Sequence, residues 1–377
     1  MNCFGKDIAT GRGVEIRHGE TIDEVTPSAE PAGWWIAPGW IDLQVNGFAG
    51  VDYNCPETEP AEIARSLEAL FATGVTRFYP TVITGLPERM AASLRNLARC
   101  RRELANGEAM EGFHVEGPHI AIEDGPRGAH PRPWVRPPDL EEFHHWQEAA
   151  EGRVRMVTLS PEWPQAVSYI ESIVAEGVVA SIGHTAATTA QIADAVRAGA
   201  TVSTHLGNGA HASLRKAPNY LWDQLAEDRL MAGFIVDGVH LDWNFLKVAL
   251  RAKGIERSVL VTDATIAAGA AVGRYRFGEL EIELTPRQRV VLAGTDRLAG
   301  SALRMDRGVE NLAAIAGLPL DAAVRMASIN PAIAGRVPGR GRGLVAGERA
   351  DFVMFRFEEG KIETIRTWLS GREVWSK

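Results

Sequence analysis

Short runs of apolar and β-branched residues recur between residues 39 and 264, and segments with a helical pattern separate them. Each run is bounded by Gly, Pro or polar residues, as β-strands usually are. Eight runs fit this description, at 39–47, 75–84, 111–117, 155–161, 178–185, 201–207, 230–238 and 258–264. The pattern therefore predicts eight β-strands in this part of the chain.

Between several of these runs, apolar residues recur three and four positions apart, which is the spacing of one face of an α-helix. The clearest examples are 61–74, 89–107 and 188–200, and a Gly lies at or beside the end of each. Strands that alternate with helices predict an α/β fold with a parallel sheet, and eight such units favour a (β/α)₈ barrel of the TIM type. An open, doubly wound sheet is the structural alternative.

The two ends of the chain do not follow the barrel pattern. Residues 13–25 alternate between apolar and polar positions, and residues 347–375 resemble short strands with turn signals at "EEG" and "SG". We expect the termini to form one small β-sandwich domain, residues 1–37 and 335–377, beside a barrel of residues 38–334.

Composition and charge narrow the possible partners. The chain has 377 residues, of which 45% are hydrophobic and 23% charged, as in ordinary globular proteins. Its net charge of −8 comes from dispersed acids without a basic stripe, so we expect no nucleic-acid partner. No apolar run approaches the roughly 20 residues of a membrane span, and Cys3, Cys55 and Cys100 form no disulfide or zinc pattern. We therefore expect a cytoplasmic protein without a membrane partner.

Candidate chemistry lies where the predicted strands end, because the working residues of a (β/α)₈ barrel sit at the C-terminal ends of its strands. Several predicted strands end in polar side chains that can bind a metal or move a proton. They are Gln44, Asn46, Glu116, His184, His205, Asp237, His240 and Asp263. We expect them at the mouth of the barrel.

Glu116, His184 and His205 supply one carboxylate and two imidazoles. This ligand set occurs in catalytic zinc sites, where a fourth position stays open for water. Each histidine alone could simply bond to the backbone, but together these strand-end residues predict a site for a divalent metal. Zinc is the expected ion, and iron, manganese or cobalt can occupy the same ligands.

Asp263 ends the apolar run "SVLVTDA". A carboxylate beside an activated water can take its proton and pass it to the leaving group. We therefore interpret Asp263 as a general acid/base. The structural alternative is that it caps the helix that follows.

Nine short motifs follow one another along the chain. They are "PGWIDLQVNG", "HVEGPH", "GAHP", "GHTAAT", "THLGNG", "DGVHL", "LVTDA", "LAGSAL" and "GLVAGERADFV". In this order they resemble the motifs of N-acetylglucosamine-6-phosphate deacetylases of the amidohydrolase superfamily, over nearly the whole chain. The resemblance implies a hydrolase of a linear amide, which converts N-acetyl-D-glucosamine 6-phosphate to D-glucosamine 6-phosphate and acetate.

The resemblance also implies roles for individual residues. One divalent metal per subunit would be held by Glu116, His184 and His205, and Asp263 would be the acid/base. These are the same roles that the residue types predict. The two lines of argument therefore agree on the centre of the site.

Other roles come from the resemblance alone. His130 of "GAHP", in a Pro- and Gly-rich segment at 118–137 that predicts a long loop, would polarise the acetyl carbonyl. His240 of "DGVHL" would contact the phosphate end of the sugar. Asn208 and the backbone amide of Gly209 would also meet the phosphate, although the family usually has other neighbours around this Asn.

The chain departs from the family where an Arg normally reaches across a subunit interface to the phosphate. The matching position is Lys216, preceded by Arg215, and a Lys cannot form the bidentate fork of an Arg. The resemblance implies a homodimer. The alternative is that the segment around Arg215 and Lys216 is only a solvent-exposed loop. His119 and His211 lie outside the family pattern, and no role follows for them.

Gln44 and Asn46 stand where many metal-dependent hydrolases of this fold carry His-x-His. Neutral amides are poor ligands for a transition metal, but they form hydrogen bonds. We interpret the pair as filling the position of a vacated second metal, in a single-metal site where they hold Asp263 or water.

Two other functions remain open from the sequence. An amidohydrolase of this type could deacetylate a different N-acetyl amino sugar or an N-acyl amino acid. More remotely, the barrel could bind a sugar phosphate without catalysis, although such a protein has no need of Glu116, two histidines and Asp263 together.

Overall fold

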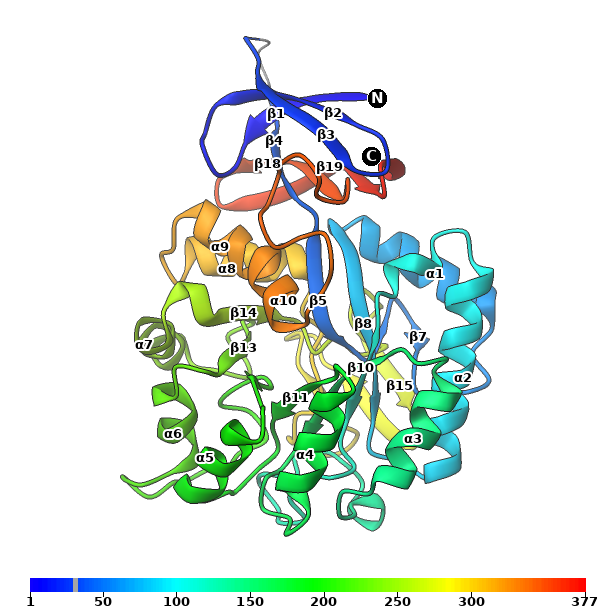
Figure 1. The fold of residues 1–377 in the computed structure, drawn as a ribbon, viewed down its shortest axis with the longest axis vertical. Helices are drawn as coiled ribbons and strands as arrows, with labels where there is room; N and C mark the ends of the chain where they lie inside the picture. The colour runs from blue at the N-terminus through cyan, green and yellow to red at the C-terminus, as the bar shows by residue number, and fades with distance from the viewer. Residues whose placement is uncertain (30–32) are drawn as a thin grey trace.

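The computed structural model describes residues 1–29 and 33–377, and it contains an eight-stranded parallel sheet (Figure 1). The order of strands in this sheet follows their order in the chain, as in a barrel and unlike a doubly wound sheet. The strands are β5 (Trp40–Val45), β8 (Val75–Ile83), β9 (Phe113–Glu116), β10 (Val154–Leu159), β11 (Val179–Ile182), β12 (Val202–Ser203), β13 (Met231–Ile235) and β14 (Ser258–Val261). All eight predicted strands are confirmed.

The barrel closes where its last strand meets its first. Val45 and Ala264 form a parallel bridge, and Asn46 N donates to Ala264 O at 2.7 Å. Inside the barrel, Asp42 accepts hydrogen bonds from the backbone N and the hydroxyl of Thr262. This seam places the end of β5 beside the residues that follow β14.

Helices surround the barrel, and the three predicted ones are confirmed with slightly shorter bounds. In α1 (Pro60–Phe71), Ile63, Leu67 and Leu70 are buried at helical spacing. The outer helices are α1, α2 (Pro87–Glu103), α3 (Leu140–Ala149), α4 (Ala166–Ala175), α5 (Thr189–Arg197), α6 (Tyr220–Ala226), α7 (Trp243–Lys253), α8 (Met305–Ala314), α9 (Leu320–Ala327) and α10 (Ile329–Ala334). Among the described residues, no helix is both long and apolar enough to cross a membrane.

Both termini contribute to one seven-stranded sheet outside the barrel, as expected from their alternating patterns (Figure 1). Its order is β20 (Arg372–Ser376), β19 (Lys361–Leu369), β18 (Phe352–Glu358), β4 (Trp35–Pro38), β1 (Asn2–Asp7), β2 (Gly13–His18) and β3 (Ile22–Pro27). Ile16, Ile36 and Phe352 share one apolar core, so the two layers of the sandwich are two halves of a single curled sheet. The predicted domain boundaries stay a prediction, and residues 30–32 of the predicted segment 1–37 lie outside the described residues.

Buried ion pairs join the barrel to this sheet at the N-terminal ends of β8 and β9. Arg77 Nε lies 2.9 Å from Asp351 Oδ2, and both side chains are fully buried. Arg349 Nε lies 3.1 Å from Asp351 Oδ1, which also accepts from Ser370 N at 2.7 Å. Arg349 reaches Glu111 as well, at 3.4 Å. Each carboxylate of this cluster therefore faces a guanidinium.

A three-stranded antiparallel sheet between β14 and α8 is a feature that we did not predict. It consists of β15 (Gly273–Phe277), β16 (Leu280–Leu284) and β17 (Val290–Leu292). The alternation in "RYRFGELEIEL", with a Gly at its centre, is the signal of a β-hairpin and could have revealed it. This insertion reaches the mouth of the barrel and forms part of the site.

Candidate active site

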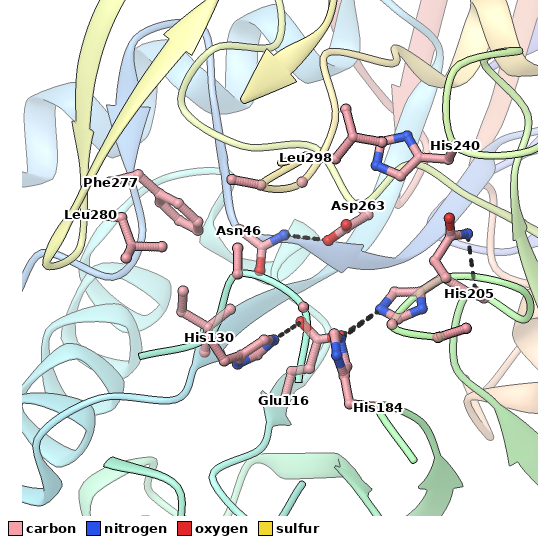
Figure 2. Close-up of a pocket in the computed structure, with 18 of the residues that line it drawn as sticks. Asn46, Glu116, His130, His184, His205, His240, Asp263, Phe277, Leu280 and Leu298 are labelled. Atoms are coloured by element: carbon pink, nitrogen blue, oxygen red, sulfur yellow. Dashed lines mark hydrogen bonds and ion pairs between the residues drawn. The ribbon is translucent and has the colours of Figure 1, made fainter. Parts of the chain in front are cut away.

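A cavity of about 240 Å³ lies at the C-terminal ends of the barrel strands. Figure 2 shows that side chains from five strand ends point toward one another in it. They are Asn46 after β5, Glu116 of β9, His184 after β11, His205 after β12 and Asp263 after β14. The structure thus brings these predicted residues together. Gln44 joins them, because its side chain donates hydrogen bonds to Glu116 and Asp263.

Three predicted ligand atoms meet within a small volume. Glu116 Oε1 lies 2.8 Å from His205 Nε2 and 3.3 Å from His184 Nε2, and the two Nε2 atoms are 3.1 Å apart. Ligands bound to zinc at about 2.0–2.1 Å in a tetrahedron lie roughly 3.3 Å from one another. The three atoms therefore fit one face of a metal coordination tetrahedron.

His130 is a further candidate ligand, because the imidazoles of His130 and His184 and the carboxylate of Glu116 offer ligand atoms within 4.8 Å of one another. His130 Nε2 is, however, 3.9 Å from Glu116 Oε2. The shorter separations to His205 Nε2 favour the set of Glu116, His184 and His205.

The hydrogen bonds around these residues fit a cation. His184 Nδ1 donates to Pro126 O at 2.9 Å, so Nε2 is the ring nitrogen that is available to a metal. Nε2 faces His205 Nε2 and a Glu116 oxygen. Burial acts to raise the pKa of Glu116, but the neighbouring His184 and His205 side chains outweigh it and hold that pKa well below its usual range. A site that favours an ionised carboxylate and brings nitrogen and oxygen ligand atoms to one point suits a positive ion.

Backbone strain aims several of these side chains. His184, His205 and Asp263 have φ values of 49°, 26° and 51°, in the left-handed region that residues with a Cβ rarely adopt. Such conformations cost about 1–3 kcal/mol each and cluster at functional sites. Gly209 has a different constraint, because a Cβ there would lie 2.6 Å from His184 Nδ1. The backbone around the cavity is therefore shaped to position the ligands.

Neutral amides hold Asp263. Its Oδ1 accepts from Asn46 Nδ2 at 2.7 Å and from Gln44 Nε2 at 3.1 Å, and Gln44 Nε2 also donates to Glu116 Oε1 at 2.7 Å. Burial and the charge of Glu116 raise the pKa of Asp263 to about 6. Gln44 thus bridges two carboxylates that would otherwise repel each other.

His130 approaches the same centre from the loop at 118–137. Its Nδ1 lies 2.7 Å from the hydroxyl of Thr84, and its ring packs edge-to-face on His184 with centroids 4.4 Å apart. Burial and the neighbouring His184 lower the pKa of His130 to about 3, so the ring is neutral. When Thr84 donates to Nδ1, the hydrogen of the ring is on Nε2, which faces the cavity. Thr84 is a contact that the sequence did not point to.

His240, Asn208 and Gly209 line the other end of the cavity. His240 Nδ1 lies 2.7 Å from Asp237 Oδ2, and Asp237 Oδ1 accepts from two backbone N–H groups. Burial acts to raise the pKa of Asp237, but the hydrogen bond and charge of His240 outweigh it and lower that pKa. Asp237 therefore orients the His240 ring with Nε2 free for a ligand.

Other predicted or unassigned residues lie elsewhere. Arg215 and Lys216 are exposed on the loop between β12 and α6 and do not line this cavity. His119 is buried against the Trp146 and Tyr169 rings, outside the cavity. His211 Nε2 lies 3.1 Å from Glu123 Oε1, which joins its loop to residues 118–137.

Apolar side chains that the sequence did not single out complete the lining. They are Ile83, Ala129, Ala210, Phe277, Leu280, Leu298 and Ala299. Two of them come from the unpredicted hairpin.

Comparisons with known proteins agree with this geometry. The model of the amidohydrolase family matches residues 35–374, and this family uses a divalent metal. The N-acetylglucosamine-6-phosphate deacetylase of Homo sapiens is 34% identical, covering 90% of this chain and 83% of its own. That of Bacillus subtilis (strain 168) is 34% identical, covering 75% of this chain and 70% of its own.

Solved structures give the same result. N-acetyl-D-glucosamine-6-phosphate deacetylase from Mycobacterium smegmatis aligns over 100% of both chains, with a TM-score of 0.89 and 31% identity. A mutant of that protein in complex with N-acetyl-D-glucosamine-6-phosphate aligns over 96% of this chain and 94% of its own, with a TM-score of 0.87 and 33% identity. The chain therefore belongs to the amidohydrolase family and, within it, to the family of the N-acetylglucosamine-6-phosphate deacetylases.

Proposed function

We propose that this protein hydrolyses N-acetyl-D-glucosamine 6-phosphate to D-glucosamine 6-phosphate and acetate. The observation that carries the proposal is the meeting of Glu116, His184 and His205 beside an Asp263 that is held by neutral amides. The relatives named as deacetylases of this substrate, and the solved complex of one mutant with it, support the choice of substrate.

One divalent ion per subunit belongs to the proposal, with zinc preferred over iron, manganese or cobalt. Held by Glu116, His184 and His205, it would supply Lewis acidity, which lowers the pKa of water. Gln44 and Asn46 occupy the place of a second ion, because their amides donate to the carboxylates there.

The residues of the chain divide the remaining work. Asp263 takes a proton from the attacking water while the water oxygen bonds to the acetyl carbon. Asp263 then gives that proton to the amide nitrogen as the C–N bond breaks. His130 donates from Nε2 to the acetyl oxygen, where negative charge develops. This tautomer requires the Thr84 hydroxyl, which lies 2.7 Å from His130 Nδ1, to donate to that nitrogen.

The phosphate would lie at the end of the cavity formed by His240, Asn208 and Gly209. No Lys or Arg is among the described residues that line the cavity. A second copy of the chain could supply one, through Lys216 or Arg215 on their exposed loop. A homodimer is therefore part of the proposal. We also propose that the protein is cytoplasmic.

A panel of N-acetyl compounds tests the proposal. Acetate release from N-acetylglucosamine 6-phosphate should exceed release from unphosphorylated N-acetylglucosamine and from N-acetyl amino acids, measured as kcat/KM. Equal rates with and without the phosphate would favour another N-acyl substrate. Tight binding of the sugar phosphate without acetate release would indicate a binding protein.

A further inference from the structure

The cavity has two chemically different ends. Figure 2 shows Phe277 and Leu280 on the side of Asn46 and His130, and His240 on the opposite side beyond Asp263. The His240 end carries hydrogen-bonding groups. The Phe277 end is apolar.

The apolar end is one packed unit. Ile83, Ala129, Phe277 and Leu280, which we call the acyl wall, all belong to a single apolar cluster between the barrel and the β15–β17 sheet. Phe277 is buried, while the other three keep a surface toward the cavity. Leu298 also lines the cavity, but it lies near His240 and outside this cluster (Figure 2).

The tip of the hairpin that carries Phe277 and Leu280 is fixed from two sides. Gly278 N donates to the buried carboxylate of Asp52 at 2.6 Å. Trp134 Nε1 donates to Glu279 Oε2 at 2.7 Å. A wall anchored in this way cannot retreat easily from a larger ligand.

The chemistry of an amide substrate decides what meets this wall. The carbonyl carbon bears three groups: the oxygen, the amine nitrogen with its sugar, and the acyl chain. If the sugar phosphate extends toward His240 and the oxygen faces His130, the acyl chain is directed away from His240, to the side of the cavity where Phe277 and Leu280 lie (Figure 2).

We propose that the acyl wall packs against the acyl group of the substrate and limits it to a short, unbranched chain. This inference rests on the proposed function for the direction of the sugar. It adds a specificity element, supplied by an insertion outside the barrel, that neither the metal ligands nor Asp263 provide. Apolar pockets distinguish substrates that differ by one methylene by about 10- to 200-fold.

The test compares N-acetyl, N-propionyl and N-butyryl glucosamine 6-phosphate, with the ratio of kcat/KM for propionyl over acetyl as the readout. Leu280→Ala should raise this ratio about tenfold, because it opens space at the wall. Ile83→Val is a milder variant, which should shift the ratio in the same direction by about threefold. Leu298→Ala is the matched control, with an unchanged ratio.

A ratio that stays constant in Leu280→Ala and Ile83→Val, or that rises equally in Leu298→Ala, would overturn the acyl wall. Failure of the proposed function looks different, since the wild-type protein would then release no acetate from the sugar phosphate. In that case the same ratio, measured on the N-acyl amine that is cleaved, decides the inference. Cleavage of no N-acyl amine would overturn both.

Discussion

The two ends of the barrel both bury charged side chains, but they balance them differently. At the N-terminal end, Asp351 lies 2.9 Å from Arg77 and 3.1 Å from Arg349, so carboxylates and guanidinium groups compensate one another. At the C-terminal end, Glu116 and Asp263 are buried near imidazoles and neutral amides, and no Lys or Arg is among the described residues lining the cavity.

This difference separates a stabilising cluster from a reactive one. At the N-terminal end, opposite charges face each other within the protein, so no ligand is needed to balance them. At the C-terminal cluster, imidazole nitrogens and carboxylate oxygens converge on one point, where a cation would bind. This convergence of ligand atoms, more than burial, marks the functional end.

Removal of the metal should have the largest effect and should act only on the C-terminal end. We expect a chelator to abolish acetate release and to lower the unfolding temperature by several degrees, because the converging ligand atoms lose their cation. Zinc should restore both. Elemental analysis should give one equivalent per chain, and two tightly bound equivalents would contradict the roles of Gln44 and Asn46.

Asp263→Asn should reduce kcat by about 10²–10⁴-fold, because the amide cannot accept the proton from water. The metal content should stay at one equivalent, which separates loss of the acid/base from loss of the site. Steady-state kinetics on the acetylated sugar phosphate measures the effect. Unchanged acetate release would refute the acid/base role.

Asp351→Asn should give the opposite result, with loss of stability and retained chemistry. Breaking a buried ion pair on one side costs about 3–5 kcal/mol, because the buried guanidinium groups of Arg77 and Arg340 both lose the charge of Asp351. Denaturant unfolding measures this loss, and kcat of the folded fraction should equal that of the wild type. A large fall in kcat would show that the two ends are coupled.

Substitution of Asp42 should have the smallest effect, since this residue lies inside the barrel and belongs neither to the metal ligands nor to the Arg cluster. Burial raises the pKa of Asp42 to about 7, above its value in the unfolded chain. Its protonation therefore contributes stability that is present below about pH 4 and is lost as pH rises toward 7. The free energy of unfolding of Asp42→Asn, relative to wild type, should rise by about 2–4 kcal/mol between pH 4 and 8. A difference that does not vary with pH would contradict this.

Strand ends are the part of the site that a sequence can predict. Glu116, His184 and His205 each lie at the end of a predicted strand, and a parallel barrel brings the C-terminal ends of its strands together whatever the loops do. Hydrogen bonds between side chains on different barrel strands cannot be predicted from any local sequence pattern. The contact of Gln44 with both Glu116 and Asp263 depends on where the barrel closes.

Loops and insertions were harder to predict for physical reasons. His130 is held by Thr84, a residue 46 positions away that no periodicity connects to it. The hairpin at 273–284 has a clear alternating pattern, but its apolar face is completed by barrel residues such as Ile83. Lys216 and Arg215 would act in the site of a second copy of the chain, and the position of that copy cannot be predicted from local sequence patterns.

The closure of the barrel between β5 and β14 is needed to position Asp263. Asn46 and Asp263, joined by a hydrogen bond, are 217 residues apart in the chain and follow the first and last barrel strands. A nascent chain or a partly unfolded form in which β14 has not docked on β5 leaves this carboxylate without its amide partners. The positioning of Asp263 by Asn46 therefore requires a closed barrel.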